Sequence, residues 1–534
     1  MNYPVLLHDY FDNSVSNHPH KEALIYGDKR YTYKEVYNQA NMVADCMIDL
    51  GLNARDRVVI YMDNVPEVII SMYATLKAGG VFAIINSATR ARKLSYIIQD
   101  CEPKIIIADM AKEETVGQAL KQSEVSPVVI WVGKEIKSSL TNDSISRIHW
   151  NAIINPDSFE QKRYDFSTRR VLDVDLAALI YTSGSTGDPK GVMEPHFNII
   201  SAARSISEYL RNTPDDIILN TLPLSFDYGL YQVIMTFMFG GTLVLEKTFI
   251  FLSRILTLID KEKVTGFPIV PTIVAMIFKT IDIKSFEFKS LRYITNTGSA
   301  FPVEHIRKLR EILPGVQIFS MFGLTECKRI SYLPPEYIDS KPSSVGKAMP
   351  NSEVFVVDEN EKPVNKGETG QLVVRGSNVM KGYWKAPELT ARTFRKGLGY
   401  NENLLFTGDF FKMDDEGFLY FLGRKDDMIK SRGERISAKE IENTIAQIEG
   451  VMECAVIGVA DEILGQAIKA YVALFPSVTM DKKDITSYCV QNLESYSVPK
   501  YVEIISELPK TPHGKIDKKA LKEENTQIDP DPVV

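Results

Sequence analysis

Short apolar runs alternate with segments of helical periodicity along the first part of the chain. Arg57–Met62 and Val81–Ile85 have the length and composition of buried strands, and Glu67–Ala78 between them has the spacing of a helix. That helix is followed by Gly79–Gly80, a helix stop signal. Alternation of this kind is typical of parallel sheets covered by helices, and it continues to about residue 335.

The pattern changes twice after this α/β region. From Val345 it becomes short strands separated by Gly, Pro and Asn, which predicts a β-rich lobe at about residues 340–424. A charged segment, GRKDDMIKSRGER, then has few apolar residues and resembles a linker. Beyond it, Ser437–Ile448 is amphipathic with Ser437 as N-cap, and strand-like runs follow. We therefore expect a large N-terminal domain at residues 1–424 and a small α+β domain at residues 425–534.

Composition narrows the classes of protein. The net charge of −7 argues against nucleic acid as the main partner. The five cysteines are scattered, odd in number and without CxxC spacing, which fits a reducing compartment and neither a disulfide framework nor a zinc site. The N-terminus has no basic n-region, and the longest apolar stretch, Val233–Leu245, is too short to span a bilayer. We expect a cytoplasmic protein without a membrane partner.

The stretch Tyr181–Val192, YTSGSTGDPKGV, combines four hydroxyls, three glycines and one lysine directly after the strand-like run Leu176–Tyr181. Glycines let backbone N–H groups approach phosphate oxygens, hydroxyls add donors, and a lysine supplies positive charge. The stretch is not a Walker A motif, because Lys190 lies between Pro189 and Gly191 and no helix begins at the lysine. Taken alone, it also fits a flexible Gly/Ser surface loop.

Further short motifs follow in a fixed order. They are Met321–Glu326 (MFGLTE), Phe406–Asp409 (FTGD), Gly423–Asp427 (GRKDD) and Pro512–Lys515 (PHGK). Each is weak alone, since Gly-Asp and Gly-Lys turns are common. Their order and separations make coincidence improbable.

Together these motifs resemble the adenylate-forming superfamily, which includes acyl- and aryl-CoA synthetases, adenylation domains of nonribosomal peptide synthesis and luciferase. The resemblance covers nearly the whole chain, including Gly382–Phe394 and His513–Leu521. It implies an α/β fold, with a large N-terminal domain of two mixed or parallel sheets plus a β-rich lobe, and a small mobile α+β C-terminal domain. It also implies use of ATP and Mg²⁺: a carboxylate joins ATP as an acyl-adenylate, pyrophosphate leaves, and a thiol takes the acyl group.

The resemblance assigns expected roles in nucleotide binding. Asp409 and Arg424 would bind the ribose, Phe322 would stack on the adenine, and Gly298, Ser299 and Ala300 would line it. The complete set of expected ATP-binding residues is Thr182, Ser183, Gly184, Ser185, Thr186, Gly187, Lys190, Gly298, Ser299, Ala300, Phe322, Asp409, Phe421 and Arg424.

The resemblance also assigns catalytic roles. Thr325 would contact the α-phosphate, and Glu326 would coordinate Mg²⁺ through a hard oxygen ligand. Lys515 would bridge the substrate carboxylate and the α-phosphate, offsetting their mutual repulsion. Asp426 matches the hinge about which the small domain would rotate, withdrawing Lys515 and bringing the segment at Lys430 towards the thiol.

The run Pro223–Gln232, PLSFDYGLYQ, gives information on which carboxylic acid is the substrate. In amino-acid adenylation domains an aspartate at the position of Asp227 pairs with the substrate's α-ammonium, although some acyl ligases have a similar run. If Asp227 is buried without a cation, an acid lacking the amine leaves its charge unpaired and is rejected. A capping or surface-loop aspartate is the alternative interpretation. The expected substrate-binding residues are Asp227, Tyr228, Tyr231, Pro268, Thr295, Thr297, Met321, Arg329 and Ile330.

The bulk of the two tyrosines and Met321 favours a compact acid, and Arg329 either faces an acidic group or points into solvent. The resemblance is nearest to standalone enzymes of natural-product biosynthesis that load an amino acid onto a carrier protein, with L-proline as the best guess. The phosphopantetheine thiol would then belong to a separate carrier protein. An acyl- or aryl-CoA ligase is the alternative, and a non-catalytic nucleotide-binding protein or a P-loop NTPase is a third interpretation.

Overall fold

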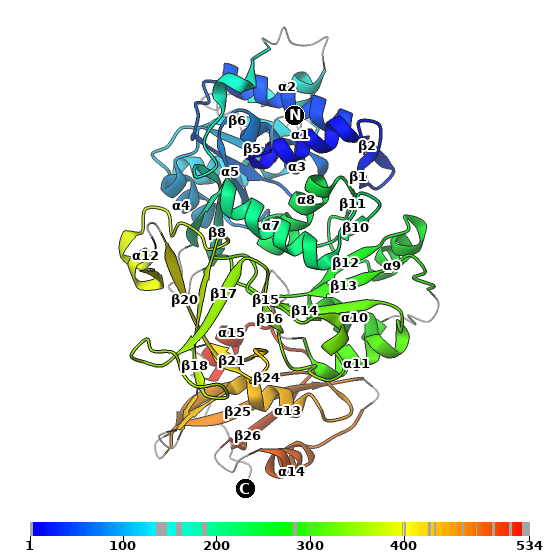
Figure 1. Ribbon diagram of the computed structural model, residues 1–534, viewed down its shortest axis with the longest axis vertical. Coiled ribbons are helices and arrows are strands. Elements are labelled where there is room, and N and C mark those ends of the chain that lie inside the picture. The colour runs from blue at the N-terminus through cyan, green and yellow to red at the C-terminus, as the bar shows by residue number, and fades with distance from the viewer. Residues whose placement is uncertain are drawn as a thin grey trace.

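A computed structural model gives the arrangement of most of the chain. It describes residues 4–134, 147–155, 163–183, 189–280, 286–298, 301–397, 399, 402–424, 429–431, 434–461, 464–476, 478–493, 497–511 and 515–525. The strands of these residues form four sheets, two large and two small. Figure 1 shows helix α1 (Leu7–Asn17) near one end of the molecule, strand β26 (Tyr501–Ile505) near the other, and strands β14 (Gln317–Phe322) and β17 (Ser352–Val357) in the middle.

The first large sheet contains mostly parallel strands. β10, β11, β12, β13 and β14 pair in parallel, and antiparallel strands complete the sheet at its two edges. In spatial order the strands are β16 (Lys347–Ala348), β15 (Ser331–Tyr332), β14 (Gln317–Phe322), β13 (Tyr293–Asn296), β12 (Gly266–Ile269), β10 (Ile217–Asn220), β11 (Thr242–Leu245), β1 (Glu22–Tyr26) and β2 (Lys29–Thr32).

The second large sheet is also parallel except at the β8–β9 hairpin. In spatial order its strands are β7 (Arg147–His149), β6 (Val128–Val132), β5 (Ile105–Asp109), β3 (Arg57–Tyr61), β4 (Val81–Ile85), β8 (Leu176–Ser183) and β9 (Pro189–Pro195). Strands such as β4 are buried along their whole length, as expected for parallel strands with both faces covered.

Helices cover these sheets, and one apolar core joins both of them. It includes Ile60 of the second sheet, Leu219 of the first, and residues of the helices between them. The helices of this part of the chain are α1 (Leu7–Asn17), α2 (Tyr33–Asp49), α3 (Pro66–Lys77), α4 (Ala91–Cys101), α5 (Glu113–Lys121), α6 (Trp150–Ile154), α7 (His196–Leu210), α8 (Asp227–Phe239), α9 (Leu252–Lys261), α10 (Pro271–Thr280) and α11 (Val303–Ile312). Of these, α4 and α5 pack in a separate apolar core with strands of the second sheet.

The two small sheets have apolar cores of their own. The lobe contains β17 (Ser352–Val357), β18 (Thr369–Gly376), β19 (Phe394–Lys396), β20 (Asn403–Met413), β21 (Leu419–Arg424) and helix α12 (Pro387–Thr393). The C-terminal sheet contains β22 (Ile429–Ser431), β23 (Glu434–Ile436), β24 (Val451–Asp461), β25 (Gly465–Leu474) and β26 (Tyr501–Ile505), with α13 (Ala438–Ile445), α14 (Lys482–Asn492) and α15 (Lys518–Asn525).

The predicted α/β fold with a small C-terminal α+β unit is confirmed. The expected helix at Glu67–Ala78 is α3, and the Ser437 side chain accepts a hydrogen bond from the Glu440 N–H as the N-cap of α13. The described residues of the charged segment predicted to be a linker are paired strands, because Gly423 and Arg424 end β21 and β22 pairs with β23 in antiparallel fashion. The proposed hinge residue Asp426 lies outside the described residues. Among the helices of the described residues, none combines the length and apolar character needed to cross a bilayer.

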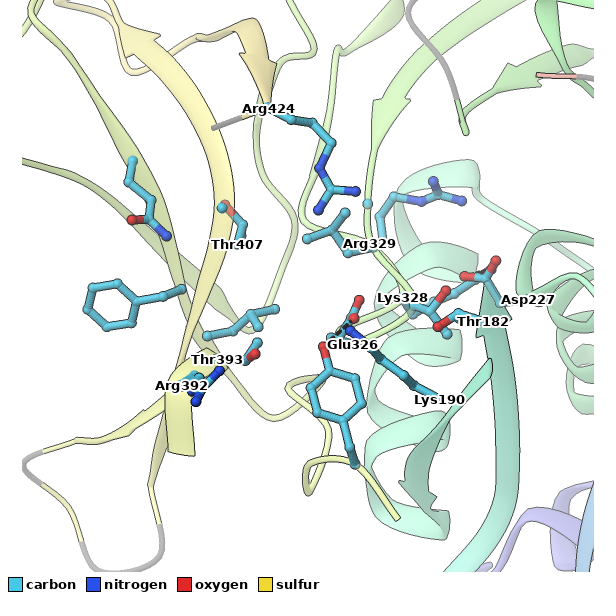
Figure 2. A pocket seen from close by; sticks show the side chains of 18 of the residues that line it. Thr182, Lys190, Asp227, Glu326, Lys328, Arg329, Arg392, Thr393, Thr407 and Arg424 are labelled. Carbon is cyan, nitrogen blue, oxygen red and sulfur yellow. Dashed lines mark hydrogen bonds and ion pairs between the residues drawn. The ribbon is translucent and has the colours of Figure 1, made fainter. Parts of the chain in front are cut away.

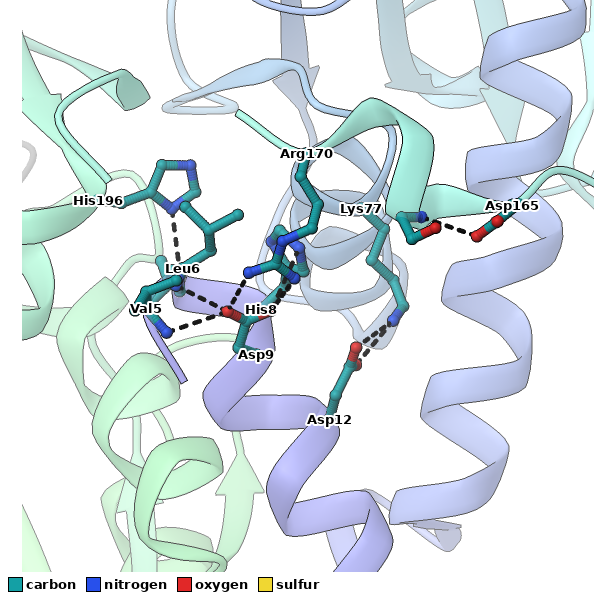
Figure 3. Close-up of polar contacts among 11 residues, drawn as sticks. Val5, Leu6, His8, Asp9, Asp12, Lys77, Asp165, Arg170 and His196 are labelled. Atoms are coloured by element: carbon teal, nitrogen blue, oxygen red, sulfur yellow. Dashed lines mark hydrogen bonds and ion pairs between the residues drawn. The ribbon is translucent and has the colours of Figure 1, made fainter. Parts of the chain in front are cut away.

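A buried polar cluster ties helix α1 to the rest of the large domain (Figure 3). The N–H of Leu7 donates to Nδ1 of His196 at 3.1 Å, and Arg170 donates two hydrogen bonds of 2.8 Å to Asp9. Burial would raise the pKa of Asp9, but the hydrogen bonds that it accepts from Arg170 and from the N–H groups of Leu6 and Val5, just before α1, bring that pKa below its ordinary value. Lys77 donates to Asp12 at 2.7 Å.

Two histidines in this cluster are held neutral. Burial lowers the pKa of His8 to about 3 and that of His196 to about 4, and neighbouring positive charges add to the effect at His8. A proton on Nδ1 of His196 would also face the N–H of Leu7, since that nitrogen accepts its hydrogen bond. The folded state therefore excludes protons that an unfolded histidine binds near pH 6.5.

We predict that the stabilisation from the two neutral histidines is fully present above about pH 6.5. The free energy of unfolding should fall as the pH drops towards 5, by roughly 2 kcal/mol for each buried histidine. His196→Asn keeps an acceptor for Leu7 and removes the titrating group, so its melting temperature should fall less between pH 7.5 and pH 5 than that of the wild type. His20→Asn, at an exposed position, is the control. An equal fall in His196→Asn and wild type would contradict the role given to His196.

Candidate functional site

Three neighbouring loops meet because they follow parallel strands of one sheet. Asn220, Asn296 and Phe322 end β10, β13 and β14. The carboxyl ends of parallel strands lie at one edge of a sheet, which is where ligands bind in α/β folds. The loops that follow carry Ser225–Tyr228, Thr297–Gly298 and Gly323–Arg329, and all three line one cavity.

This cavity has a volume of about 1330 Å³ and lies between the large sheets, the β-rich lobe and the C-terminal unit. Figure 2 shows Arg392, Thr393 and Thr407 on the lobe side, facing Thr182, Lys190 and Asp227. The predicted site residues that line it are Thr182, Lys190, Asp227, Tyr228, Thr297, Gly298, Thr325, Glu326, Arg329, Arg424 and Lys515. Residues more than 300 positions apart in sequence are thus brought together as predicted.

The Gly/Ser/Thr stretch connects the two strands of a hairpin. Thr182 on β8 is directly opposite Lys190 on β9, and both reach the cavity. Lys190 lies on a strand, so the prediction that no helix begins at this lysine is confirmed. Gly184, Ser185, Thr186 and Gly187 lie outside the described residues, as do Ser299 and Ala300, and the side chain of Ser183 is not described.

Glu326 presents its carboxylate to the cavity beside a tyrosine. The Tyr383 hydroxyl donates to Glu326 Oε1 at 2.6 Å, and Nζ of Lys190 lies 6.0 Å from the centre of the Tyr383 ring. Burial and the charge of Glu326 raise the pKa of Tyr383, so it stays a donor. No group of three or more His, Cys, Asp or Glu residues that could hold a metal occurs in the described ranges.

Asp409 and Arg424 are opposite each other on β20 and β21, and Arg424 Nε lies 3.3 Å from Asp409 Oδ1. Arg424 lines the cavity, whereas Asp409 is buried behind it. Phe322 and Phe421 differ from the prediction. Their rings stack on each other at 5.6 Å and pack against Phe411, and neither lines the cavity. The Phe322 ring therefore packs into the lobe interface instead of forming an open adenine platform.

Lys515 enters the cavity from the C-terminal unit. The Lys515 N–H donates to Thr511 Oγ1 at 3.2 Å and the Thr511 N–H to the Lys515 carbonyl at 2.7 Å, which holds the backbone of Lys515 against that of Thr511. Nζ lies 5.6 Å from the centre of the Phe226 ring. Burial lowers the pKa of Lys515, and the negative charge of Asp227 opposes that shift.

Asp227 is buried in the cavity wall at the first position of α8, so the surface-loop alternative is wrong. The condition on which the selectivity argument depended, an Asp227 buried without a cation from the protein, is not met. Lys328 Nζ lies 3.3 Å from Asp227 Oδ2, and the two residues are only 2% and 7% exposed. The carboxylate already has a counter-charge from the protein itself, so an acid without an amine no longer leaves it unpaired.

Aromatic rings and a second acid surround Lys328. Its Nζ lies 4.3 Å from the centre of the Tyr231 ring, and the Tyr231 hydroxyl donates to Glu194 Oε2 at 3.4 Å. Burial, followed by the charge of Asp227, raises the pKa of Glu194 well above its ordinary value. Arg329 is 2% exposed and its guanidinium lies 5.4 Å from the centre of the Tyr228 ring.

The other residues expected around the acid lie behind the cavity wall. Thr295 hydrogen-bonds the Tyr228 hydroxyl, and Tyr231 contacts Lys328 and Glu194. Pro268 is buried in β12, and Met321 Sδ accepts from the Tyr209 hydroxyl. Ile330 belongs to the apolar core of the lobe. Of the substrate-binding set, only Asp227, Tyr228, Thr297 and Arg329 line the cavity.

Sequence reasoning missed Lys328, Glu194 and Tyr383. Lys328 stands beside the predicted residue Arg329 and directly after Glu326–Cys327. Two adjacent basic residues this close to the MFGLTE motif were the signal that could have identified Lys328. Glu194 lies on β9 among apolar residues, where a fully buried acid has to be paired or neutral. Tyr383 is part of the Gly382–Phe394 stretch that carries the resemblance.

Comparison with known proteins agrees with this geometry. The family model described as AMP-binding enzyme matches residues 11–384, and that of its C-terminal domain matches residues 440–515. The long-chain-fatty-acid–CoA ligase of Bacillus subtilis (strain 168) is 30% identical over 541 residues, which cover 98% of this chain and 95% of that protein. Bacitracin synthase 1 of Bacillus licheniformis is 28% identical over 97% of this chain, but the matched part is 9% of that protein.

A solved structure supports the fold across both units. The anthranilate CoA ligase AuaEII in complex with anthranoyl-AMP matches with a TM-score of 0.88 and 26% identity, covering 98% of each chain. Adenylate-forming enzymes use ATP with Mg²⁺. Thr182, Lys190, Thr325 and Arg424 bring hydrogen-bond donors or positive charge to the cavity lining, and Glu326 brings a carboxylate, an oxygen group of the kind that Mg²⁺ prefers.

We predict that Lys515→Ala lowers acid-dependent ATP–pyrophosphate exchange by about 10²–10³-fold, because a positioned cation in the transition state is lost. ATP binding, measured by calorimetry, should remain. Lys519→Ala, with an exposed side chain in the same C-terminal segment, is the control and should retain exchange. Normal exchange by Lys515→Ala would remove Lys515 from the reaction.

A double-mutant cycle tests the buried ion pair. Asp227→Asn or Lys328→Met alone leaves one buried charge without its partner and should cost about 3 kcal/mol. The double variant should be more stable than the sum of the two losses predicts, as followed by thermal unfolding. The exposed pair Lys289–Glu287, with a contact of 2.6 Å, is the control and should have little effect. Additive losses at Asp227 and Lys328 would mean that the two side chains do not pair.

Proposed function

The chain belongs to the AMP-binding enzyme family, and on this premise we propose that it joins a small carboxylic acid without an α-ammonium group to ATP, releases pyrophosphate and transfers the acyl group to a thiol. In the first step a carboxylate oxygen forms a bond to the α-phosphorus while the bond to pyrophosphate breaks. In the second, the thiol sulfur bonds to the acyl carbon, the bond to AMP breaks, and the thiol proton passes to solvent.

The residues of the cavity support this sequence of steps. Lys515 would hold the carboxylate and the α-phosphate together, and Thr182, Thr325 and Lys190 would bind phosphate oxygens. A bound Mg²⁺ supplies charge neutralisation at the phosphates, and Glu326, oriented by Tyr383, would hold it. Asp409 and Arg424 would hold the ribose as a pair.

Transfer to the thiol requires a second arrangement of the same chain in this proposal. The small domain, residues 425–534, would rotate about Asp426, withdraw Lys515 and bring Lys430 to the thiol. The acceptor is a phosphopantetheine thiol, either of coenzyme A or of a separate carrier protein. Exchange-competent protein incubated with each acceptor in turn distinguishes the two.

The ion pair between Lys328 and Asp227 is the observation that favours a substrate acid without an α-ammonium group. An incoming ammonium would have to compete with Lys328 for Asp227 and would also meet the charge of Arg329 in the same wall. An acid without the amine leaves the existing pair intact. A compact acid fits because Tyr228 and Tyr231 fill the region around the pair.

Activation of a small amino acid, L-proline being the sequence-based choice, is the second candidate. The observation in its favour is that the charge of Asp227 acts on Lys515, so a carboxylate at Lys515 would bring its α-ammonium towards Asp227. The similarity to bacitracin synthase 1 is compatible with this candidate and with carrier-protein transfer.

We predict that pyrophosphate exchange is at least about tenfold faster with the deamino member of matched acid pairs, a difference of about 1.4 kcal/mol. Suitable pairs are cyclopentanecarboxylate with proline, propionate with alanine, succinate with aspartate and glutarate with glutamate. Each pair holds size and shape nearly constant and changes only the amine.

Faster exchange with the amino-acid member would instead establish the second candidate. No exchange with any acid of the panel, in protein that binds ATP, would reject acid activation within this size range.

A further inference from the structure

The wall of the acid cavity contains more positive than negative charge. Lys328, Arg329 and Asp227 line it, and Glu194 lies directly behind. All four residues are less than 10% exposed. A charge in such a place must be matched by another charge, because water does not surround it.

Asp227 can match only one of the two cations. Its Oδ2 lies 3.3 Å from Lys328 Nζ. Arg329 has no carboxylate within ion-pair distance among the described residues, and its buried Nε has no hydrogen-bond partner there. Its guanidinium lies against the ring of Tyr228 and beside the hydroxyl of Tyr209, which are both neutral groups.

Glu194 does not supply the missing negative charge. One of its oxygens accepts from Tyr231, and Oε1 is buried without a partner in the part of the chain that the structure describes. Burial and the charge of Asp227 raise the pKa of Glu194 well above its ordinary value, and within the described ranges no hydrogen bond or ion pair joins Glu194 to Arg329. Lys328 has its pKa lowered to about 8 by burial, so it remains mostly protonated at neutral pH, and an arginine is always charged.

The backbone holds both cations at the cavity. Lys328 has a φ of 62°, a left-handed conformation that is uncommon for lysine, and the Arg329 N–H donates to the Cys327 carbonyl at 2.7 Å. The buried Asn378 side chain donates to the carbonyls of Cys327 at 2.8 Å and Arg329 at 2.9 Å. This turn places two consecutive side chains in one wall, and Figure 2 shows Lys328 beside Asp227 with Arg329 next to them.

The two ends of the cavity suit the two ends of one molecule. Lys515 lines the same cavity, and Asp227 acts electrostatically on both Lys515 and Lys328. The cation for the reacting carboxylate, Lys515, and the unmatched cation, Arg329, therefore line one and the same cavity. We infer that the acid activated by this protein carries a second carboxylate, bound by Arg329 with Lys328 beside it: the substrate is a short dicarboxylic acid. This inference rests on the proposed function and deepens it.

Pyrophosphate exchange with matched diacids and half-esters tests the inference on the full-length protein. Malonate, succinate and glutarate are each compared with their monomethyl esters, which keep the reacting carboxylate and remove the second charge. We expect at least one diacid to have a kcat/KM at least tenfold above that of its half-ester. Half-esters, or monocarboxylic acids such as cyclopentanecarboxylate, reacting as well as the diacids would overturn the inference and leave the proposed function intact. No acid-dependent exchange at all would overturn both.

Variants locate the second carboxylate. Arg329→Met should raise the KM for the preferred diacid at least tenfold with a smaller change in kcat, and should reduce the preference over the half-ester. Arg329→Lys should restore part of that preference, because it returns a charge without the bidentate guanidinium. Arg307→Met, an exposed residue of α11, is the matched control. ATP binding and melting temperature are measured for each variant, and an unchanged diacid preference in a folded, ATP-binding Arg329→Met protein would overturn the assignment.

Discussion

Burial of charge beside the cavity is the constraint on which the rest of the site depends. Lys328, Arg329, Asp227 and Glu194 are nearly sealed from water, so each has to be paired, neutral or complemented by a ligand. Asp227 is paired by Lys328, and Glu194, whose pKa is raised by burial, accepts a hydrogen bond from Tyr231 through one oxygen. Arg329 is left facing aromatic and hydroxyl groups. A ligand with a negative charge in the cavity would therefore give the Arg329 guanidinium the ionic partner that the protein itself does not supply.

The sheet makes this arrangement possible. The parallel strands β10, β13 and β14 end at one edge of the sheet, and the loops that follow them line one cavity. Asp227 and Arg329, and also Thr325 and Glu326, lie on these loops or directly after them. The C-terminal unit then adds Lys515 from outside the sheet. Lys515 belongs to the C-terminal unit, which has an apolar core of its own. The position of this unit relative to the large domain therefore decides whether the Lys515 ammonium is near the reacting carboxylate and α-phosphate.

Much of the fold and half of the site could be predicted from sequence. Buried parallel strands are continuous apolar runs, so Val81–Ile85 was recognised directly, and Thr182, Lys190, Glu326 and Lys515 stand in ordered motifs. The partner of Asp227 could not be predicted in this way. Lys328 is about a hundred positions away, and only a left-handed turn held by Asn378 directs it inward. Phe322 failed for a similar reason: its ring packs on Phe421, a contact set by how the lobe meets β14.

The left-handed turn at Lys328 also has a consequence for tolerance to substitution. A lysine in this conformation is less favourable than glycine or asparagine by about 1–2 kcal/mol, and the packing of Gly323 against the Lys328 carbonyl leaves little room to relax. Glycine or asparagine at position 328 would relieve this backbone strain, but either would also remove the positive charge that pairs with Asp227. Selection for thermostability and selection for substrate discrimination would therefore favour different residues at this one position.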